Sequence, residues 1–363
     1  MRRGANTSAY RPVGIFLAVL LSLLACSGED GSLVGPGPEG DDSLNLPPDP
    51  WSPATIGTAF TVEQLRAGNL GGQTLHCAGP LHEPSEYEDY VEAFATHPPA
   101  MWVTYYSLIN VRFTPVERLA VLKNELARYG ELPFLGISYT EKLSDGSHRG
   151  WDPEVTAGLF DGELRAIAKA LAEDGRPILL RPGFEFNGAW NNYQPESYRS
   201  SFVHIRSLFD DEGADNVVWV WNAHPAGAIA PFMEFYPGDE VVDWWGINFF
   251  GKAFDSHSQQ AFTEEFVAAA KARGKPLSIP ESIPSKTHLL DDPTTWSAWF
   301  TPYFDLIRAE GIAAFCYSNR DYTQVPAWSD WGDLRIERSP LRDAWESVLG
   351  KGWVANAPLT DGT

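Results

Sequence analysis

From residue 71 onward, short apolar segments alternate with longer amphipathic ones, and this alternation limits the possible folds more than any other feature. Such a pattern is typical of repeated strand–helix units, which build parallel sheets. Eight segments have the length and composition of strands. They are Thr74–Ala78, Met101–Ser107, Leu132–Ser138, Pro177–Glu185, Asn216–Asn222, Val242–Phe249, Pro276–Glu281 and Ile312–Ser318.

The segments between these strands have the apolar spacing of amphipathic helices. In Pro115–Tyr129, apolar residues recur at Val116, Leu119, Leu122 and Leu126, close to the 3.6-residue period of a helix. The fifth unit is the weakest, because its connection over 225–240 reads as a loop. The other expected helices are Ala157–Asp174, Pro195–Phe209, Thr263–Arg273, Pro293–Glu310 and Ser339–Leu349.

Eight consecutive strand–helix units predict an α/β fold, a (β/α)8 TIM barrel, formed as a single domain over residues 54–355. The run Val217-Val-Trp-Val220 supports it, because strands buried on both faces are continuously apolar. The chain has 363 residues and a hydrophobic fraction of 44%, enough for one large core. A doubly wound open sheet is the alternative, but no glycine-rich phosphate loop follows any strand.

The N-terminal segment has the features of an export signal. Arg2, Arg3 and Arg11 precede an apolar stretch over 13–24, and Leu23-Leu-Ala-Cys26 resembles the bacterial lipobox. The resemblance implies that residues 1–25 are removed as a signal peptide and that Cys26 is lipidated. Residues 26–53, rich in Gly, Pro, Asp and Ser, are expected to form a flexible tether, and 356–363 a C-terminal tail. We therefore expect an exported protein, lipid-anchored to the bacterial outer membrane on its periplasmic or cell-surface side.

The charge and the cysteine and histidine content bound the partners and cofactors. A formal net charge of −21 argues against nucleic acid and favours a neutral substrate over a polyanionic one. The eight histidines are not spaced as metal ligands, so we expect no metal. We also expect no other cofactor, and we expect the protein to be a monomer. Cys77 and Cys316 lie on the first and last strands. Bridges between parallel strands are strained, so two buried free thiols are favoured over a disulfide.

Polar residues gather where the predicted strands end. Barrel active sites form from the carboxyl ends of the strands, and here these ends carry Glu185 on the fourth strand and Glu281 on the seventh. Strand alternation would place Arg181, Gly183 and Glu185 on one face. Hydrolysis of a glycosidic bond needs two carboxyl groups, and a separation of about 5–5.5 Å gives retention through a covalent glycosyl-enzyme. Arg181 is placed to keep one glutamate ionised, while burial would raise the pKa of the other.

The segment Arg181-Pro-Gly-Phe-Glu-Phe-Asn-Gly-Ala-Trp190 resembles the acid/base segment of family 26 glycoside hydrolases, the β-mannanase type within the retaining barrel clan. Further segments resemble other strands of that family: Asn216-Val-Val-Trp-Val-Trp221, Val242-Asp-Trp-Trp-Gly-Ile-Asn-Phe-Phe-Gly251 and Lys275-Pro-Leu-Ser-Ile-Pro-Glu281. The resemblance implies that Glu185 is the acid/base and Glu281 the nucleophile of a retaining endo-glycosidase. Its expected substrate is a neutral β-linked polysaccharide, with mannan first, then β-xylan or β-glucan.

Two residues depart from the family pattern. Phe184 stands where the mannanases have His, and Phe249 stands where a Tyr would hydrogen-bond the nucleophile. These departures leave open the alternative of a catalytically impaired carbohydrate-binding surface lipoprotein on the same barrel. A transglycosylase that uses the same site is a second alternative. The residues expected to contact sugar are Arg181, Asn187, Trp190, Trp221, Asn222, His224, Trp245, Asn248 and Tyr317.

Overall fold

The computed structural model describes residues 60–80, 84–109 and 112–357. The predicted signal peptide, lipidation site and tether lie outside these residues. Within them the chain forms a closed parallel barrel, because β11 pairs with both β10 and β1. The fold is therefore the expected (β/α)8 barrel. Its strands are β1 (Thr74–Gly79), β2 (Met101–Ser107), β3 (Leu132–Ser138), β6 (Ile178–Pro182), β7 (Val217–Ala223), β8 (Trp244–Ile247), β10 (Leu277–Ile283) and β11 (Ala314–Ser318).

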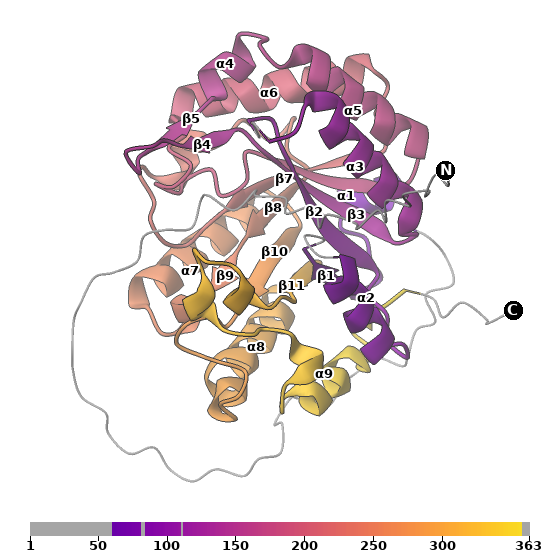
Figure 1. Cartoon of the computed structure of the whole chain (residues 1–363), viewed down its shortest axis with the longest axis vertical. Coiled ribbons are helices and arrows are strands. Elements are labelled where there is room, and N and C mark those ends of the chain that lie inside the picture. The colour runs from indigo at the N-terminus through magenta and orange to yellow at the C-terminus, as the bar shows by residue number, and fades with distance from the viewer. Residues whose placement is uncertain (1–59, 81–83, 110–111, 358–363) are drawn as a thin grey trace, which may run out of the picture.

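Helices surround the barrel, with α3, α5 and α6 along one side and α7, α8 and α9 along the other (Figure 1). Local signals account for several helix ends: at α3, Thr114 and Glu117 form a capping box and Pro115 occupies the first turn. The helices are α1 (Val62–Arg66), α2 (Pro84–Ala93), α3 (Pro115–Arg128), α4 (Asp152–Thr156), α5 (Asp161–Asp174), α6 (Pro195–Asp211), α7 (His257–Ala272), α8 (Thr301–Glu310) and α9 (Arg342–Leu349).

Shorter strands and helical turns lie outside the barrel strands and the main helices, mostly in the loops that follow the strands. The hairpin of β4 (Thr140–Lys142) and β5 (His148–Gly150) follows β3, and β12 (Val354–Ala355) pairs with β1. The fifth unit contains only one 3-10 turn, Phe232–Phe235, as its loop-like sequence indicated. The others are β9 (Phe249–Phe250), the 3-10 turns Gly251–Phe254, Tyr322–Gln324, Ser329–Trp331 and Ile336–Arg338, and the π-helical Trp296–Phe300 that leads into α8.

The core has two layers that follow the two faces of the strands. Side chains that point into the barrel, such as Val103, Leu179 and Val220, form an inner cluster. Their neighbours along the strands point outward and pack with the helices, as Trp219 and Trp221 do. Because strand side chains alternate with period two, every second residue of a barrel strand faces the interior. This alternation decides which side chains reach the site at the end of the barrel.

The expectation of two free thiols is wrong, because Cys77 and Cys316 form a disulfide. The register places Cys77 of β1 directly beside Cys316 of β11. Both side chains belong to the inner cluster, so they face each other with 4.2 Å between their Cα atoms. Direct pairing on the same face makes the bridge possible. It joins the first and last strands of the barrel.

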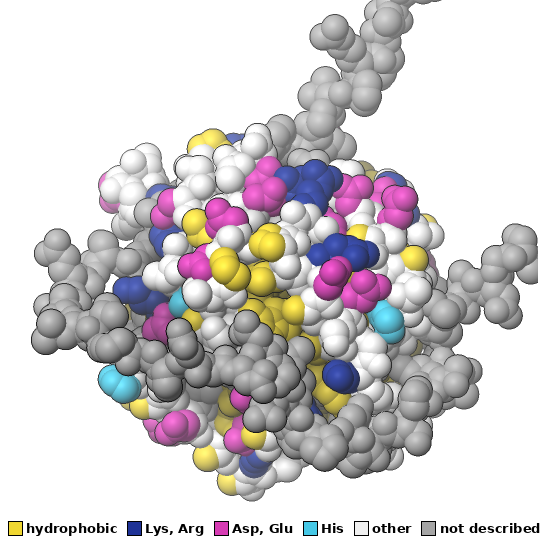
Figure 2. All heavy atoms as spheres, turned by 90° about the horizontal axis from the view of Figure 1, so that it is seen from below, with side chains coloured by type: hydrophobic (Ala, Val, Ile, Leu, Met, Phe, Trp, Pro, Cys, Tyr) yellow, Lys and Arg dark blue, Asp and Glu magenta, His cyan; other side chains and the backbone are white. Residues whose placement is uncertain are grey.

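On the face shown in Figure 2, basic side chains lie beside acidic ones around a central group of hydrophobic side chains. No helix within the described residues is both long enough and apolar enough to cross a bilayer.

Asn356, assigned to the C-terminal tail, is held by hydrogen bonds with Leu349 and His76. The folded part therefore continues through at least Ala357, whose backbone N–H donates to Pro98.

Candidate active site

Glu185 does not lie on a strand, contrary to the alternation expected from the sequence. Strand β6 ends at Pro182, and Gly183 and Glu185 both adopt left-handed backbone conformations, with φ of 58° and 53°. A side chain at position 183 would meet the Tyr139 hydroxyl, 2.3 Å from its Cβ. Only glycine fits such a position, where φ is positive and the backbone lies against another side chain. A tight turn, not strand periodicity, therefore aims Glu185.

Glu281 is aimed by an irregularity in β10. Ile279 and Ser282 of β10 lie opposite Phe315 and Tyr317 of β11, so three steps along one strand match two along the other. Such an extra residue is a β-bulge, which reverses the alternation beyond it. Without the bulge, Glu281 would share the outward orientation of Ile279, which packs in the outer layer. The bulge instead lets Glu281 pair with Arg181, which lies in the interior of the barrel.

Arg181 is the cation of the site and is completely buried. Its Nη1 donates to Glu281 Oε1 at 2.5 Å and to Asn222 Oδ1 at 2.9 Å. Its guanidinium lies 4.8 Å from the ring centre of Phe184 and 5.1 Å from that of Tyr105. Aromatic faces attract cations at such distances. The guanidinium is thus fixed by rings as well as by the carboxylate.

A second set of donors holds Glu185. Asn248 Nδ2 donates to Glu185 Oε1 at 2.9 Å, and the indole of Trp190 donates to Oε2 at 2.7 Å. Asn222 Nδ2 donates to Asn248 Oδ1 at 3.1 Å. A continuous hydrogen-bonded chain therefore runs from Glu281 through Arg181, Asn222 and Asn248 to Glu185 and Trp190.

The two glutamates have different electrostatic surroundings. Burial raises the pKa of Glu185 to about 8, with a further contribution from the negative charge of Glu281. Hydrogen bonds from Asn248 and Trp190 and the charge of Arg181 limit this rise. Glu281 instead forms an ion pair with Arg181. One protonated carboxyl group near neutral pH beside one paired carboxylate is the arrangement that acid-assisted displacement requires.

His224 and Asn187 lie at the site, but their side chains already contact other groups of the protein. Asn187 accepts from the backbone N–H of His224 and donates to its carbonyl oxygen, at 2.9 and 2.7 Å. It therefore joins two loops rather than presenting its amide to a sugar. The His224 ring packs against Trp190 and Phe250. Burial lowers the pKa of His224 to about 4, so the ring is neutral near neutral pH.

Three residues expected to contact sugar are placed elsewhere. Trp221, Trp245 and Tyr317 are fully buried in the outer layer, between the strands and the helices. The two indoles pack on each other and on Phe266 of α7, and the Tyr317 hydroxyl donates to the carbonyl of Leu334. This placement contradicts the expected sugar contacts. The period of two explains it, since inward-facing Val220 and Cys316 are their direct neighbours in sequence.

The two departures from the family pattern occupy different surroundings. Phe184 is 7% exposed and covers the Arg181 guanidinium. Phe249 is fully buried, with its ring 5.4 Å from that of Phe254. A hydroxyl is thus missing on the β8–β9 side of the site. Arg181 nevertheless supplies Glu281 with a charged hydrogen-bond donor.

Two tyrosines near Glu281 were missed by the sequence reasoning. Tyr105 faces the interior from β2, two residues beyond inward-facing Val103, so alternation could have identified it. Tyr322 follows β11, where no strand pattern applies, and is 6% exposed. Burial raises the pKa of each, and the charge of Glu281 raises it further.

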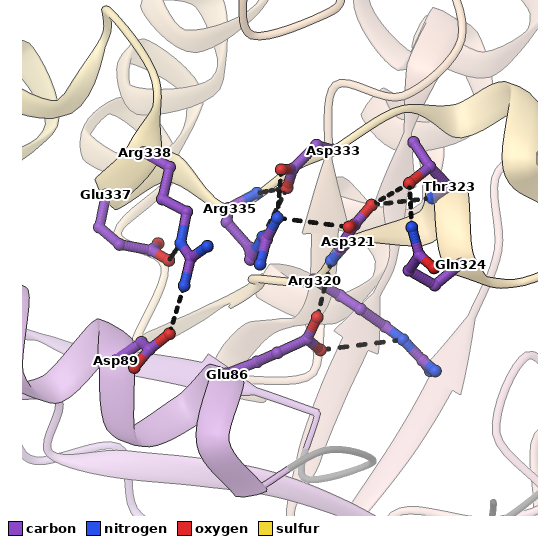
Figure 3. Close-up of polar contacts among 10 residues, drawn as sticks. All are labelled: Glu86, Asp89, Arg320, Asp321, Thr323, Gln324, Asp333, Arg335, Glu337 and Arg338. Atoms are coloured by element: carbon purple, nitrogen blue, oxygen red, sulfur yellow. Dashed lines mark hydrogen bonds and ion pairs between the residues drawn. The ribbon is translucent and has the colours of Figure 1, made fainter.

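The polar residues after β11 belong to an ion-pair network with α2 (Figure 3). Arg320 Nε lies 3.9 Å from Glu86 Oε2, and the backbone N–H of Asp321 donates to Glu86 Oε1 at 3.0 Å. Arg335 pairs with Asp321 at 3.3 Å. These contacts fix the loop that carries Tyr322. Across the residues that the structure describes, no group of three or more His, Cys, Asp or Glu is arranged to hold a metal ion.

Comparison with known proteins identifies related sequences and solved structures of the same fold. The sequence model of glycosyl hydrolase family 26 matches residues 152–303, which include both glutamates. The chain is 27% identical over 333 residues to the β-1,3-xylanase TXYA of a Vibrio species, spanning 82% of this chain and 70% of that protein. It is also 27% identical over 292 residues to a β-1,3-xylanase of an Alcaligenes species, spanning 72% of this chain and 60% of that protein. A solved endo-β-1,4-mannanase of Cellulomonas fimi has the same fold, with a TM-score of 0.60 at 17% identity over 85% of this chain and 78% of that one.

Proposed function

We propose that this chain, a glycoside hydrolase of family 26, cleaves a neutral β-linked polysaccharide internally and with retention of configuration. The observation that carries the proposal is the hydrogen-bonded chain between two glutamates of opposite character. Glu281 pairs with Arg181, whereas burial raises the pKa of Glu185. These are the two roles that retaining hydrolysis assigns to its carboxyl groups.

In the first proposed step, Glu185 gives its proton to the glycosidic oxygen while a Glu281 oxygen bonds to the anomeric carbon. The glycosidic bond breaks, and the leaving sugar departs as an alcohol. In the second step, Glu185, now a carboxylate, takes a proton from water, whose oxygen bonds to the anomeric carbon and releases Glu281. Trp190 and Asn248 would hold Glu185 in position through both steps, since both donate to its oxygens.

β-1,3-Xylan is the substrate we propose first, ahead of the mannan that the sequence resemblance suggested. Two relatives that align with most of this chain are named β-1,3-xylanases. The apolar Phe184, in place of the mannanase His, also argues against a mannan site, because a phenyl ring cannot hydrogen-bond a sugar hydroxyl. The likeness to the Cellulomonas mannanase is one of fold. Mannan, β-1,4-xylan and mixed-linkage β-glucan remain the other candidates.

Reducing-sugar release from these four polysaccharides tests the proposal. We expect release from β-1,3-xylan, with oligosaccharides rather than monosaccharide as early products, and loss of at least about 1,000-fold in Glu281→Ala. Glu125→Gln is the matched control, because Glu125 is also a largely buried carboxyl but accepts from Thr104 on the helical side of β2. It should keep near-wild-type activity.

Two results would contradict this function. If wild type releases no sugar from any of the four but is retarded by one of them in an affinity gel, the protein is a carbohydrate-binding member of the family that has lost catalysis. If Glu281→Ala retains full activity, the nucleophile is assigned wrongly. A transglycosylase would use the same two glutamates, and longer products formed from oligosaccharides would identify it.

We also propose that the chain is exported and anchored through a lipid on Cys26, facing the periplasm or the cell surface. Support comes from the basic and apolar segments that precede Leu23-Leu-Ala-Cys26. Metabolic labelling with a fatty acid should mark wild type but not Cys26→Ala. Equal labelling of the two proteins would reject the anchor.

A further inference from the structure

Asn191 lies beside the acid/base segment, and neither the family resemblance nor the proposed chemistry assigns it a role. It belongs to the loop between β6 and α6 and is 1% exposed. Its Nδ2 donates to the carbonyl oxygen of Phe184 at 2.9 Å and to that of Glu185 at 3.0 Å. Carbonyl oxygens only accept, so the amide must face them with its NH2 group. Asn191 therefore bonds the backbone of two consecutive residues in the turn after β6.

The turn needs such bonds because Glu185 has a backbone conformation that residues with a Cβ disfavour. Its φ of 53° lies in the left-handed region. The ladder of β6 ends at Pro182, so the carbonyl groups of the turn need other donors. The Glu185 carbonyl accepts from the backbone N–H of Gly188 at 2.9 Å as well as from Asn191. Since a left-handed residue of this kind persists only where its surroundings hold it, these donors keep the turn in place.

Trp190 and Asn191, neighbours in sequence, hold the two ends of Glu185. The indole of Trp190 donates to the carboxyl group, and the amide of Asn191 donates to the backbone carbonyl. The loop that carries both residues is fixed in turn. Thr140 Oγ1 donates to the Asn191 carbonyl at 3.1 Å, and a Cβ at Gly188 would lie 2.4 Å from the Trp190 ring, which packs directly on the backbone there. One short loop thus orients both the backbone and the carboxyl group of the acid/base.

We propose that Asn191 is a positioning residue for the acid/base Glu185. Its amide holds the turn in which the Glu185 carboxyl group reaches the indole of Trp190. Without the amide, the left-handed residue relaxes and its carboxyl group moves away from the glycosidic oxygen that it protonates. The inference rests on the proposed function for its catalytic meaning, but the first of its two tests needs no activity.

The first test reads the position of Glu185 from the indole N–H signal of Trp190 in ¹⁵N-labelled protein. The signal is identified by its loss in Trp190→Phe. In wild type it should lie downfield, because the N–H donates to a carboxyl group, and it should shift with pH as Glu185 titrates. In Asn191→Ala we expect it to move upfield, toward the position of a free indole, and to lose this titration. Asn191→Ser, whose hydroxyl can donate to only one carbonyl, should give an intermediate signal and supplies the comparison if Asn191→Ala does not fold.

The second test uses the leaving group to separate a loss of acid catalysis from general damage. Two aryl glycosides of the sugar that wild type releases are compared, one with dinitrophenolate and one with methylumbelliferone as the leaving group. Dinitrophenolate is a weak base and departs without a proton, whereas the more basic methylumbelliferone departs faster when an acid protonates it. We expect kcat/KM of Asn191→Ala to fall by about 100-fold for the methylumbelliferyl glycoside and by less than about threefold for the dinitrophenyl one.

Asn216→Ala is the matched control. Asn216 is also a buried asparagine whose Nδ2 donates to two carbonyl oxygens, those of Leu171 at 2.8 Å and Arg176 at 2.6 Å. It precedes β7, at the opposite end of the barrel from the site. Its replacement should lower stability and change neither the indole signal nor the ratio of the two rates.

Two results overturn the inference: an unchanged indole signal in the folded Asn191 variants, or an equal fall of kcat/KM on both aryl glycosides. If wild type cleaves no glycoside, the proposed function fails, while the indole signal still decides whether Asn191 positions Glu185.

Discussion

At the scale of single residues, two identical side chains, Glu185 and Glu281, differ in their electrostatic surroundings. Glu185 has neutral donors around it and is 2% exposed, whereas Glu281 faces a buried guanidinium. The charged form of Glu185 is therefore disfavoured by burial and by Glu281, in this order. The pH dependence of the protein should report this difference.

Replacing Glu185 by Gln should change stability in a pH-dependent way. The folded-state pKa of Glu185, about 8, lies above its ordinary value of 4.5. The folded protein then binds this proton more tightly than the unfolded chain, and the stabilisation is lost as pH rises through about 8. The free energy of unfolding of Glu185→Gln, relative to wild type, should hence be higher at pH 9 than at pH 5 by about 4 kcal/mol. Calorimetry at both pH values measures it, and an equal difference at each pH would disprove it.

Replacing Trp190 by Phe should move the basic limb of activity to higher pH. The indole N–H favours the charged form of Glu185 and so lowers its pKa. Its removal should shift the basic limb of the pH profile upward and reduce kcat by about tenfold, the effect of one lost hydrogen bond to a charged group. Trp221→Phe, in the outer layer, should lower stability and leave the pH profile unchanged. A profile that moves equally in both variants would argue against the contact.

At the scale of elements, both glutamates lie where a regular strand is interrupted. A left-handed turn follows β6 and aims Glu185, and a bulge within β10 turns Glu281 toward the interior. Regular strands place the supporting residues Arg181 and Asn222 by simple alternation. Breaks of this kind recur beside active sites because they direct a side chain that the regular pattern would point elsewhere.

Gly183→Ala tests the turn that carries Glu185. The substitution combines a positive φ with a Cβ placed 2.3 Å from the Tyr139 hydroxyl. We expect the free energy of unfolding to fall by about 3 kcal/mol or more, together with a large loss of activity. Gly213→Ala has a similar φ of 72° but meets nothing within 4 Å, so it should cost only about 1 kcal/mol. Urea denaturation of both variants gives the comparison, and equal losses would mean that the Tyr139 contact is unimportant.

At the scale of the whole molecule, the barrel is closed twice, by β10–β11–β1 pairing and by a covalent bond. The disulfide joins residues 239 positions apart. In the unfolded chain it therefore closes a loop that contains most of the sequence of the barrel. Its sulfur atoms belong to side chains of the inner cluster, which also contains Val103 and Val220. The bridge should therefore act on global stability more than on chemistry.

Reduction of this disulfide should lower the free energy of unfolding by about 2–5 kcal/mol, as expected for a cross-link that closes a long loop. The measurement is thermal or urea unfolding with and without a thiol reductant. A double variant, Cys77→Ala with Cys316→Ala, should unfold at the lower value and no longer respond to the reductant. Identical unfolding of oxidised and reduced wild type would mean that the bridge adds nothing.

The sequence by itself determined the barrel, since apolar runs and helical periods are local and recur eight times. It also predicted that Glu185 and Glu281 lie at the same end of the barrel, because the carboxyl ends of barrel strands converge. Local sequence patterns do not show where the regular geometry of a strand is interrupted. The placement of Trp221, the approach of Tyr105 and the Cys77–Cys316 bridge depend on which face each side chain takes and on which strand lies beside it. These are properties of packing between residues distant in sequence, so only the tertiary structure decided them.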